Sequence, residues 1–226
     1  MAGTTGDTIR LAAKDGFTLS AYRAAPAGTP RGGIVVLQEI FGLNPHIRSV
    51  ADGFAAEGYL AVAPALFDRV RPGIELGYSP ADVTEGAGIR ARTTMEGALA
   101  DMQAAMAEAA SAGKVGVVGY CWGGTLAYAA SARLDGVAAS VCYYGGGIAG
   151  MLAEIPRAPT IMHFGARDKH IPLTDVERIR QAYPHLSVFV YDADHGFNCD
   201  ARASFDAPAA DLARARTLEF LADKVG

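Results

Sequence analysis

Short apolar segments alternate with longer amphipathic segments along nearly the whole chain. The segment "GGIVVLQE" (32–39) is apolar almost without interruption, as in a strand buried on both faces, whereas "FTLSAYRA" (17–24) alternates like an edge strand. Strands that alternate with helices predict a single α/β domain over residues 1–226, with a mostly parallel sheet covered by helices on both faces. Residues 65–92, rich in Pro and Gly, could form an excursion over the sheet. Further buried strands are predicted at 59–64, 114–119, 137–145, 159–165 and 186–192.

The amphipathic segments between these strands predict helices. One begins at about Pro45, with Asn44 as its N-cap, and ends near Gly58. Two others are expected at 94–111 and 208–224. Helical spacing in the last one predicts a buried face formed by Leu212, Ala215, Leu218 and Leu221.

Composition excludes several classes of protein. Half of the 226 residues are hydrophobic and the formal net charge is −4, so a large core is available and no basic stripe indicates nucleic acid. The N-terminus has no apolar signal region, and no segment is long enough to span a membrane. The three cysteines are an odd number, spaced unlike a disulfide framework or a zinc site. We expect a cytoplasmic protein, most simply a monomer, that acts on a small molecule without a cofactor or metal.

The stretch "VGVVGYCWGGTLAY" (115–128) places a cysteine between a predicted strand and a predicted helix. Gly119, Cys121 and Gly123 match the nucleophile elbow, Gly-x-nucleophile-x-Gly, with cysteine in place of serine. The nucleophile of such a turn adopts a strained backbone conformation, and side chains two positions away on either side would collide with the turn. The start of the helix also favours thiolate over thiol. Cys121 is therefore a candidate nucleophile, although a small buried residue at a close strand–helix contact is the alternative.

A cysteine nucleophile requires a base, and the base requires a group that orients it. Asp168 and His195 each follow a predicted strand, and the order Cys121, Asp168, His195 is the order of an α/β-hydrolase triad. Because the carboxyl ends of parallel strands share one edge of the sheet, the three side chains are expected to lie near each other. Asp192 or Asp194 could serve as the acid instead, but a neighbour in sequence reaches the ring nitrogen less easily. Asp168 could also act only as a helix cap.

Four segments together resemble the dienelactone hydrolase family of α/β-hydrolases. The likeness extends from about residue 17 to the last helix, and "GYCxGG" with "QEIFGLN" upstream is specific to that family. It implies an α/β-hydrolase fold, and hydrolysis of carboxymethylenebutenolide or of another ester or lactone by a Cys-His-Asp triad. The segments are "LQEIFGLNPHIRSVADGFAAEGYLAVAPALFDR" (37–69), "GYCWGG" (119–124), "HFGARDKHIP" (163–172) and "YDADHGF" (191–197).

The resemblance also implies roles for residues around the triad, which would consist of Cys121 as nucleophile, His195 as base and Asp168 as its orienting acid. The backbone N–H groups of Ile40 and Trp122 would form the oxyanion hole. Glu39 would hold or accept the proton of the thiol, unless it only pairs with an arginine and fixes its loop. Substrate contacts would come from Tyr144 and Phe41.

One position departs from the family pattern. Family members specialised for dienelactone bind the substrate carboxylate with arginines, one of them four residues after the triad histidine, where this chain has Cys199. A missing bidentate contact between arginine and carboxylate would cost on the order of 2 kcal/mol in a dry site. Spacing leaves Arg202, Arg69, Arg71, Arg90 and Arg92 as possible replacements.

These residues together predict a cysteine-dependent ester or lactone hydrolase that works through a thioester on Cys121. A broad carboxylesterase or thioesterase acting on an uncharged substrate is the alternative within enzymes. A redox-sensing thiol is the alternative of another kind, with Cys199 as the resolving partner of Cys121.

Overall fold

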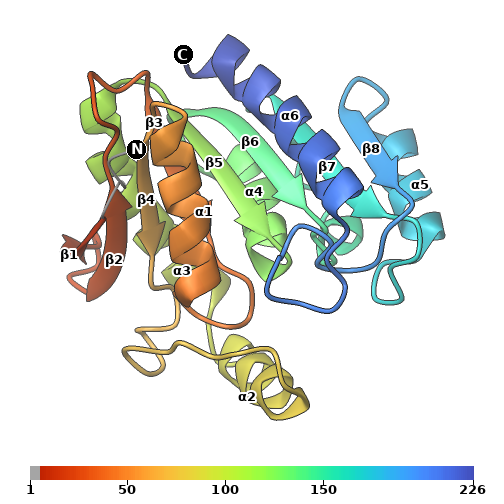
Figure 1. The fold of residues 1–226 in the computed structure, drawn as a ribbon, viewed down its shortest axis with the longest axis horizontal. Coiled ribbons are helices and arrows are strands. Elements are labelled where there is room, and N and C mark those ends of the chain that lie inside the picture. Colours follow the sequence, from red (N-terminus) through yellow and green to blue (C-terminus); the bar gives the residue numbers. More distant parts are fainter. Residues whose placement is uncertain (1–5) are drawn as a thin grey trace.

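The computed structural model describes residues 6–226, which form an eight-stranded sheet in the order β1-β2-β4-β3-β5-β6-β7-β8 (Figure 1). β2 pairs antiparallel with β1 and with β4, and every pair from β4 through β8 is parallel. The predicted mostly parallel sheet is therefore confirmed. The strands are β1 (Asp7–Ala12), β2 (Thr18–Ala24), β3 (Gly33–Leu37), β4 (Leu60–Pro64), β5 (Val115–Tyr120), β6 (Val137–Tyr143), β7 (Thr160–Gly165) and β8 (Ser187–Tyr191).

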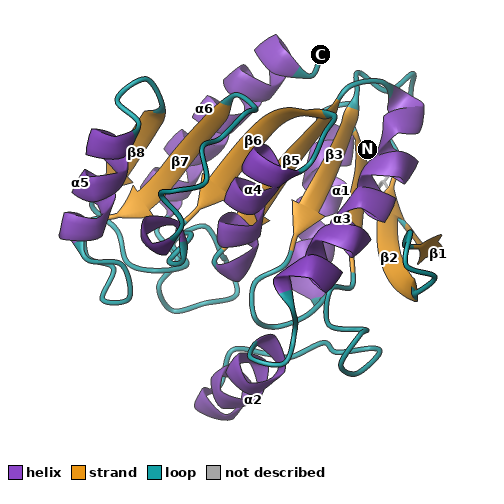
Figure 2. Ribbon diagram, turned by 180° about the vertical axis from the view of Figure 1, so that it is seen from behind, coloured by secondary structure: helices purple, strands orange, loops and turns teal. Residues whose placement is uncertain are grey.

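Helices cover both faces of this sheet, as the sequence predicts. α1 and α6 lie in front of the sheet in Figure 1, while α3, α4 and α5 lie on the opposite face, seen from behind in Figure 2. Because both faces are covered, every residue of the central strands β3 and β5 is buried. The helices are α1 (Pro45–Ala56), α2 (Pro80–Arg90), α3 (Met95–Ala109), α4 (Trp122–Arg133), α5 (Leu173–Ala182) and α6 (Ala207–Lys224), with short 3₁₀ turns at η1 (Ala110–Ala112) and η2 (Ile148–Gly150).

The structure corrects the predicted position of the edge of the sheet. β1 forms an antiparallel hairpin with β2 through a turn in which Gly16 has a φ of 86°. β1 and β8 are therefore the two edge strands, and the prediction that residues 17–24 form an edge is wrong. The predicted buried strand at 186–192 is also partly exposed, because β8 has a neighbour on one side only. The sequence of β1 gives little signal, because Leu11 is its one fully buried side chain and the strand is held mainly by backbone pairing.

The predicted helix boundaries agree closely with the structure, but the buried face of α6 does not. The Asn44 side chain accepts a hydrogen bond from the Ile47 N–H (3.2 Å), as expected of the N-cap of α1. In α6, Leu221 is buried as predicted, but Leu212 is 48% exposed, and Ala213 and Thr217 are buried instead. Thr217 Oγ1 lies 2.7 Å from the hydroxyl of Tyr143 on β6, so close approach of this helix requires small side chains that carry little hydrophobic signal.

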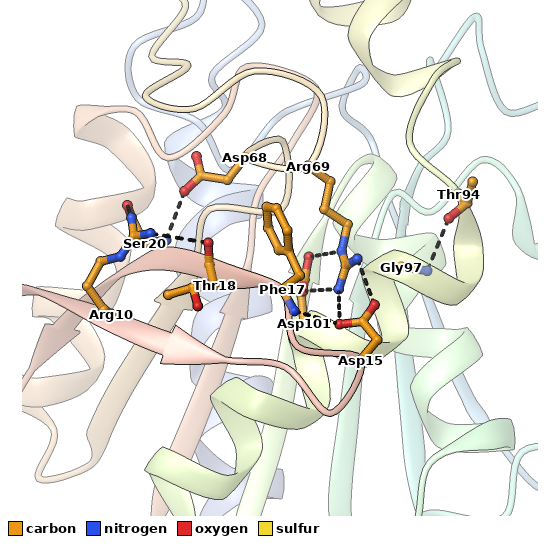
Figure 3. A network of polar contacts seen from close by, with 10 residues as sticks. All are labelled: Arg10, Asp15, Phe17, Thr18, Ser20, Asp68, Arg69, Thr94, Gly97 and Asp101. Atoms are coloured by element: carbon orange, nitrogen blue, oxygen red, sulfur yellow. Dashed lines mark hydrogen bonds and ion pairs between the residues drawn. The ribbon is translucent and has the colours of Figure 1, made fainter.

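The segment between β4 and α3 leaves the sheet, and α2 lies within it, beyond the carboxyl ends of the parallel strands (Figure 1). Sequence reading treats 65–92 as irregular and does not find this helix, although Ser79 and Asp82 form a capping box at its start. Figure 3 shows how the segment is anchored: Arg69 donates to both carboxylate oxygens of buried Asp101 on α3 (2.9 and 2.8 Å) and pairs with Asp15 in the β1–β2 turn (2.8 Å). The start of the segment that carries α2 is therefore anchored to α3 and to the β1–β2 turn.

Within residues 6–226, none of the helices combines the length and the apolar character needed to cross a lipid bilayer.

Candidate active site

Cys121 occupies a tight turn between β5 and α4. Its backbone has φ 55° and ψ −116°, a conformation that side chains rarely adopt, and its N–H donates to the Tyr143 carbonyl (3.0 Å). A Cβ on Gly119 would lie 1.9 Å from the Gly123 carbonyl oxygen, and one on Gly123 would lie 2.4 Å from the Leu37 carbonyl oxygen. Both glycines are thus required by backbone contacts, which explains the spacing of the Gly-x-Cys-x-Gly motif.

His195 and Asp168 lie on the loops after β8 and β7 and contact each other. His195 Nδ1 is 2.7 Å from Asp168 Oδ2, and the Asp168 side chain is fully buried. The other oxygen, Asp168 Oδ1, accepts hydrogen bonds from the N–H groups of His170 (2.8 Å) and Ile171 (3.1 Å). These contacts fix the carboxylate in place, so that it can hold the imidazole ring in one orientation.

The two alternative acids are placed differently. Asp194 accepts a hydrogen bond from the backbone N–H of His195 (2.7 Å), and Asp192 forms an ion pair with Arg167 (3.1 Å) while remaining 84% exposed. Asp168 is therefore the acid that this fold brings to the Nδ1 of His195.

His195 and Cys121 line the same cavity. Burial lowers the pKa of His195, but the hydrogen bonds to Asp168 and Cys121 and the charges of both groups outweigh it and raise the pKa to about 10. The arrangement therefore favours an imidazolium beside the sulfur. A neighbouring imidazolium stabilises the thiolate form, which is the reactive form of a cysteine nucleophile.

The Cys121 side chain opens into a cavity of about 310 Å³. Ile40, Phe41 and Trp122 form one part of the wall, and all three come from predicted site positions. Trp122 is the first residue of α4, where N–H groups have no acceptor within the helix. The remaining lining comes from α2 (Val83, Ala87, Arg90), from loops at the carboxyl ends of strands (Gly146, Gly147, His170, Ile171, His195, Arg202) and from Thr125.

Several of these residues are absent from the sequence-based prediction. Of the α2 residues in the lining, Arg90 is among the candidate arginines, but Val83 and Ala87 are not predicted. His170, read from the sequence as a surface or packing residue, lines the cavity with its ring edge-on to His195 at 5.3 Å. Helical spacing is a weak signal in α2, because only Gly86 and Ile89 of this helix are buried. The capping box at Ser79 is the signal that could have found the helix.

Tyr144 lies behind the cavity wall. It is fully buried, does not line the cavity, and packs against the His195 ring at 5.0 Å. Its φ of 37° marks a second strained backbone position at this edge of the sheet. The structure therefore brings Tyr144 to the ring of His195 rather than to the cavity surface, whereas Phe41 does reach the cavity.

Glu39 is buried and paired with an arginine. One oxygen, Oε1, accepts from Arg202 Nη1 (3.2 Å), and Oε2 has no hydrogen-bond partner among residues 6–226. Arg202 is the one of the possible replacement arginines that reaches both this carboxylate and the cavity. Arg90 also lines the cavity, but Arg69 and Arg71 pair with acids outside it.

Comparisons of the sequence and of the fold with known proteins give concordant matches. A sequence model described as the dienelactone hydrolase family matches residues 19–225. A carboxymethylenebutenolidase from Pseudomonas putida is 36% identical over 225 residues, covering 95% of each chain. A Synechocystis protein provisionally named a carboxymethylenebutenolidase is 39% identical, covering 85% of this chain and 86% of its own. The crystal structure of a Klebsiella pneumoniae protein, provisionally named a dienelactone hydrolase, superimposes with a TM-score of 0.83 at 30% identity, covering 96% of this chain and 99% of that one.

Proposed function

The chain belongs to the dienelactone hydrolase family of lactone and ester hydrolases, and on that premise we propose that it cleaves its substrate through a thioester on Cys121, with His195 and Asp168 completing the triad. The observation that carries the proposal is the 2.7 Å contact between His195 Nδ1 and Asp168 Oδ2, together with the strained turn that presents Cys121 to the same imidazole. A nucleophile, a base and its orienting acid meet here at one edge of the sheet.

In the first half of the reaction, the Cys121 thiolate attacks the carbonyl carbon of the lactone or ester. A bond forms between Sγ and that carbon, and negative charge develops on the carbonyl oxygen. Ile40 and Trp122 line the same cavity, and their backbone N–H groups would donate to this oxyanion. When the carbon–oxygen bond breaks, the leaving alkoxide or enolate takes the proton of the His195 imidazolium.

In the second half, water hydrolyses the thioester. Neutral His195 removes a proton from the water as its oxygen attacks the carbonyl carbon, and the Sγ–carbon bond then breaks. The product leaves as a carboxylic acid, and Cys121 and His195 return to the ion-paired state. Asp168 holds the ring in the tautomer that both halves need.

Glu39 and Arg202 supply a charge-tuning pair beside the nucleophile. The Arg202 guanidinium feels the charges of both Glu39 and Cys121. Glu39 carries one oxygen without a partner among the described residues, so it could accept a hydrogen bond from the thiol before the proton passes to His195.

The cavity favours a small substrate that carries a carboxylate. Its walls are largely apolar side chains, and Arg202 and Arg90 contribute two cationic groups. A carboxylate that binds Arg202 would compete with Glu39 for the guanidinium. This matches the chemistry of carboxymethylenebutenolide, the substrate that the names of the relatives indicate.

The test compares kcat/KM on dienelactone with kcat/KM on the same unsaturated lactone lacking its carboxylate. Cys121→Ala serves as the blank, and Cys142→Ala, which removes a fully buried thiol outside the cavity, serves as the matched control. We expect a strong preference for the acid, loss of turnover in Cys121→Ala, and a thioester adduct on Cys121 by mass spectrometry. Full activity of a folded Cys121→Ala variant would refute the mechanism.

An uncharged ester is the second candidate substrate, because Arg202 already has Glu39 as its ionic partner. Equal or faster turnover of the neutral lactone would favour it. The redox alternative has less support, since Cys199 is fully buried and does not line the cavity. It would require a disulfide between Cys121 and Cys199 after peroxide treatment and negligible turnover of both lactones.

A further inference from the structure

A second cluster of reactive side chains lies beside the cavity. Glu39 follows β3, His46 lies in the first turn of α1, and Cys199 follows β8, and all three are buried. One ligand atom from each residue lies within 4.8 Å of the other two. Carboxylate oxygen, imidazole nitrogen and thiolate sulfur are the three protein ligand types of Zn²⁺.

Two of these residues offer an atom without a partner. Glu39, 1% exposed, and His46, 8% exposed, each carry a side-chain atom (Oε2 and Nε2) that has no hydrogen-bond partner within residues 6–226. Leaving such atoms buried and unpaired costs free energy, so two of them beside a thiol indicate a group that binds between them.

The second ring nitrogen of His46 contacts a carboxylate at the protein surface. Nδ1 lies 3.0 Å from Oδ1 of Asp200, whose side chain is 73% exposed, so the ring is oriented from the surface. With the Nδ1 proton donated to Asp200, the lone pair on Nε2 is free to bind a metal. Metal-binding histidines commonly have such a carboxylate partner on their second nitrogen.

Charge and distance fit a divalent cation. Glu39 and Asp200 carry two negative charges against the one positive charge of Arg202, and the buried Cys199 thiol adds a third when it releases its proton to bind the ion. Tetrahedral zinc with bonds of about 2.0–2.3 Å separates its ligand atoms by about 3.3–3.8 Å. The 4.8 Å limit on this cluster is therefore within a small side-chain adjustment of a bound state.

We propose that Glu39, His46 and Cys199 form a binding site for Zn²⁺ or a similar borderline-soft divalent cation, with Asp200 orienting His46. A fourth position is left for water, as in other three-ligand zinc sites. A bound ion would engage Glu39 and constrain the loop that carries Ile40 and Phe41. The ion would therefore inhibit lactone hydrolysis, a consequence that rests on the proposed function, whereas binding itself does not.

Cobalt binding tests the site without reference to activity. Co²⁺ is titrated into Cys121→Ser, which removes the thiol in the cavity, and the thiolate-to-cobalt charge-transfer absorption is recorded. We expect one ion per chain in this variant and loss of the absorption when Cys199→Ser is added, because Cys142 is then the single remaining thiol. His46→Gln should abolish tight binding, and Asp200→Asn should weaken it by about 10–100-fold. His185→Gln, at an exposed histidine, is the matched control and should change nothing.

The outcomes separate the two proposals. Absence of the cobalt absorption in Cys121→Ser, or its persistence after Cys199→Ser is added, would overturn the metal site. Circular dichroism of each variant shows whether the fold is retained, and Cys199→Ala provides a second variant if Cys199→Ser does not fold. In the wild-type chain, Zn²⁺ should inhibit turnover, and Cys199→Ser should remove the inhibition. Binding without inhibition would support the site and remove its link to Glu39 in catalysis.

Discussion

The contact between α2 and the loop after β3 leads to a quantitative prediction. A Cβ on Gly86 would lie 2.1 Å from the carbonyl oxygen of Ile40, the residue whose N–H would form half of the oxyanion hole. Real Cβ contacts stay at 3.0 Å or more, so Gly86→Ala must separate α2 and the Ile40 peptide by about 1 Å. A misplacement of about 1 Å costs roughly 10²-fold in rate. We therefore expect kcat of Gly86→Ala to fall by about that factor, roughly 2.7 kcal/mol of transition-state stabilisation.

The same helix provides a matched control. A Cβ on Gly88 has no neighbour within 4 Å, so Gly88→Ala should keep full activity and stabilise α2 by about 1 kcal/mol through higher helix propensity. The assay is steady-state lactone hydrolysis by both variants, with thermal unfolding measured alongside. Equal kcat in Gly86→Ala and Gly88→Ala would refute the coupling of α2 to the oxyanion hole. A fall in kcat with little change in stability would support it.

Three further predictions concern the buried charges. Asp168→Asn should lower kcat by about 10³–10⁴-fold, because the ring of His195 loses its orienting charge, and the kcat/KM–pH profile should shift its alkaline limb towards lower pH. The pKa of His195 is raised from 6.5 to about 10, so the stabilisation from its protonated ring is complete below pH 6.5 and is lost as the pH rises to about 10. The midpoint of urea unfolding should therefore fall across that pH range. A midpoint that does not change with pH would contradict a protonated His195 in the folded state. Arg202→Met leaves Glu39 buried without its cation, so the free energy of unfolding in urea should fall by about 3–5 kcal/mol. Adding Glu39→Gln to this variant should recover most of that loss. If the losses of the two single variants simply add in the double variant, the pairing is contradicted.

Local sequence patterns were sufficient for much of the fold. The apolar segments at 32–39 and 114–119 predict buried parallel strands, because strands covered on both faces need apolar side chains throughout. The Gly-x-Cys-x-Gly spacing predicts the tight turn at Cys121, because backbone contacts at both glycines leave no room for a Cβ. Asn44 before Pro45 predicts the start of α1. In each case the physical requirement acts within a few residues along the chain.

Other features depend on contacts that no local pattern records. Leu212 of α6 is exposed although helical spacing places it in the core, because the helix approaches the sheet through Ala213 and Thr217. Spacing also could not decide which arginine reaches the cavity, since Arg202 meets Glu39 across 163 positions of sequence.

The sequence by itself determined the alternation of the central strands with their helices, the nucleophile turn and the candidate triad, but not β1 or α2. These follow from backbone sterics and from burial periodicity, which are properties of short segments. The tertiary structure decided which acid reaches His195, that α2 forms part of the cavity, and that Glu39, His46 and Cys199 share one buried space. Each of these depends on where separate loops lie at one edge of the sheet, and that placement is set by how the whole chain packs.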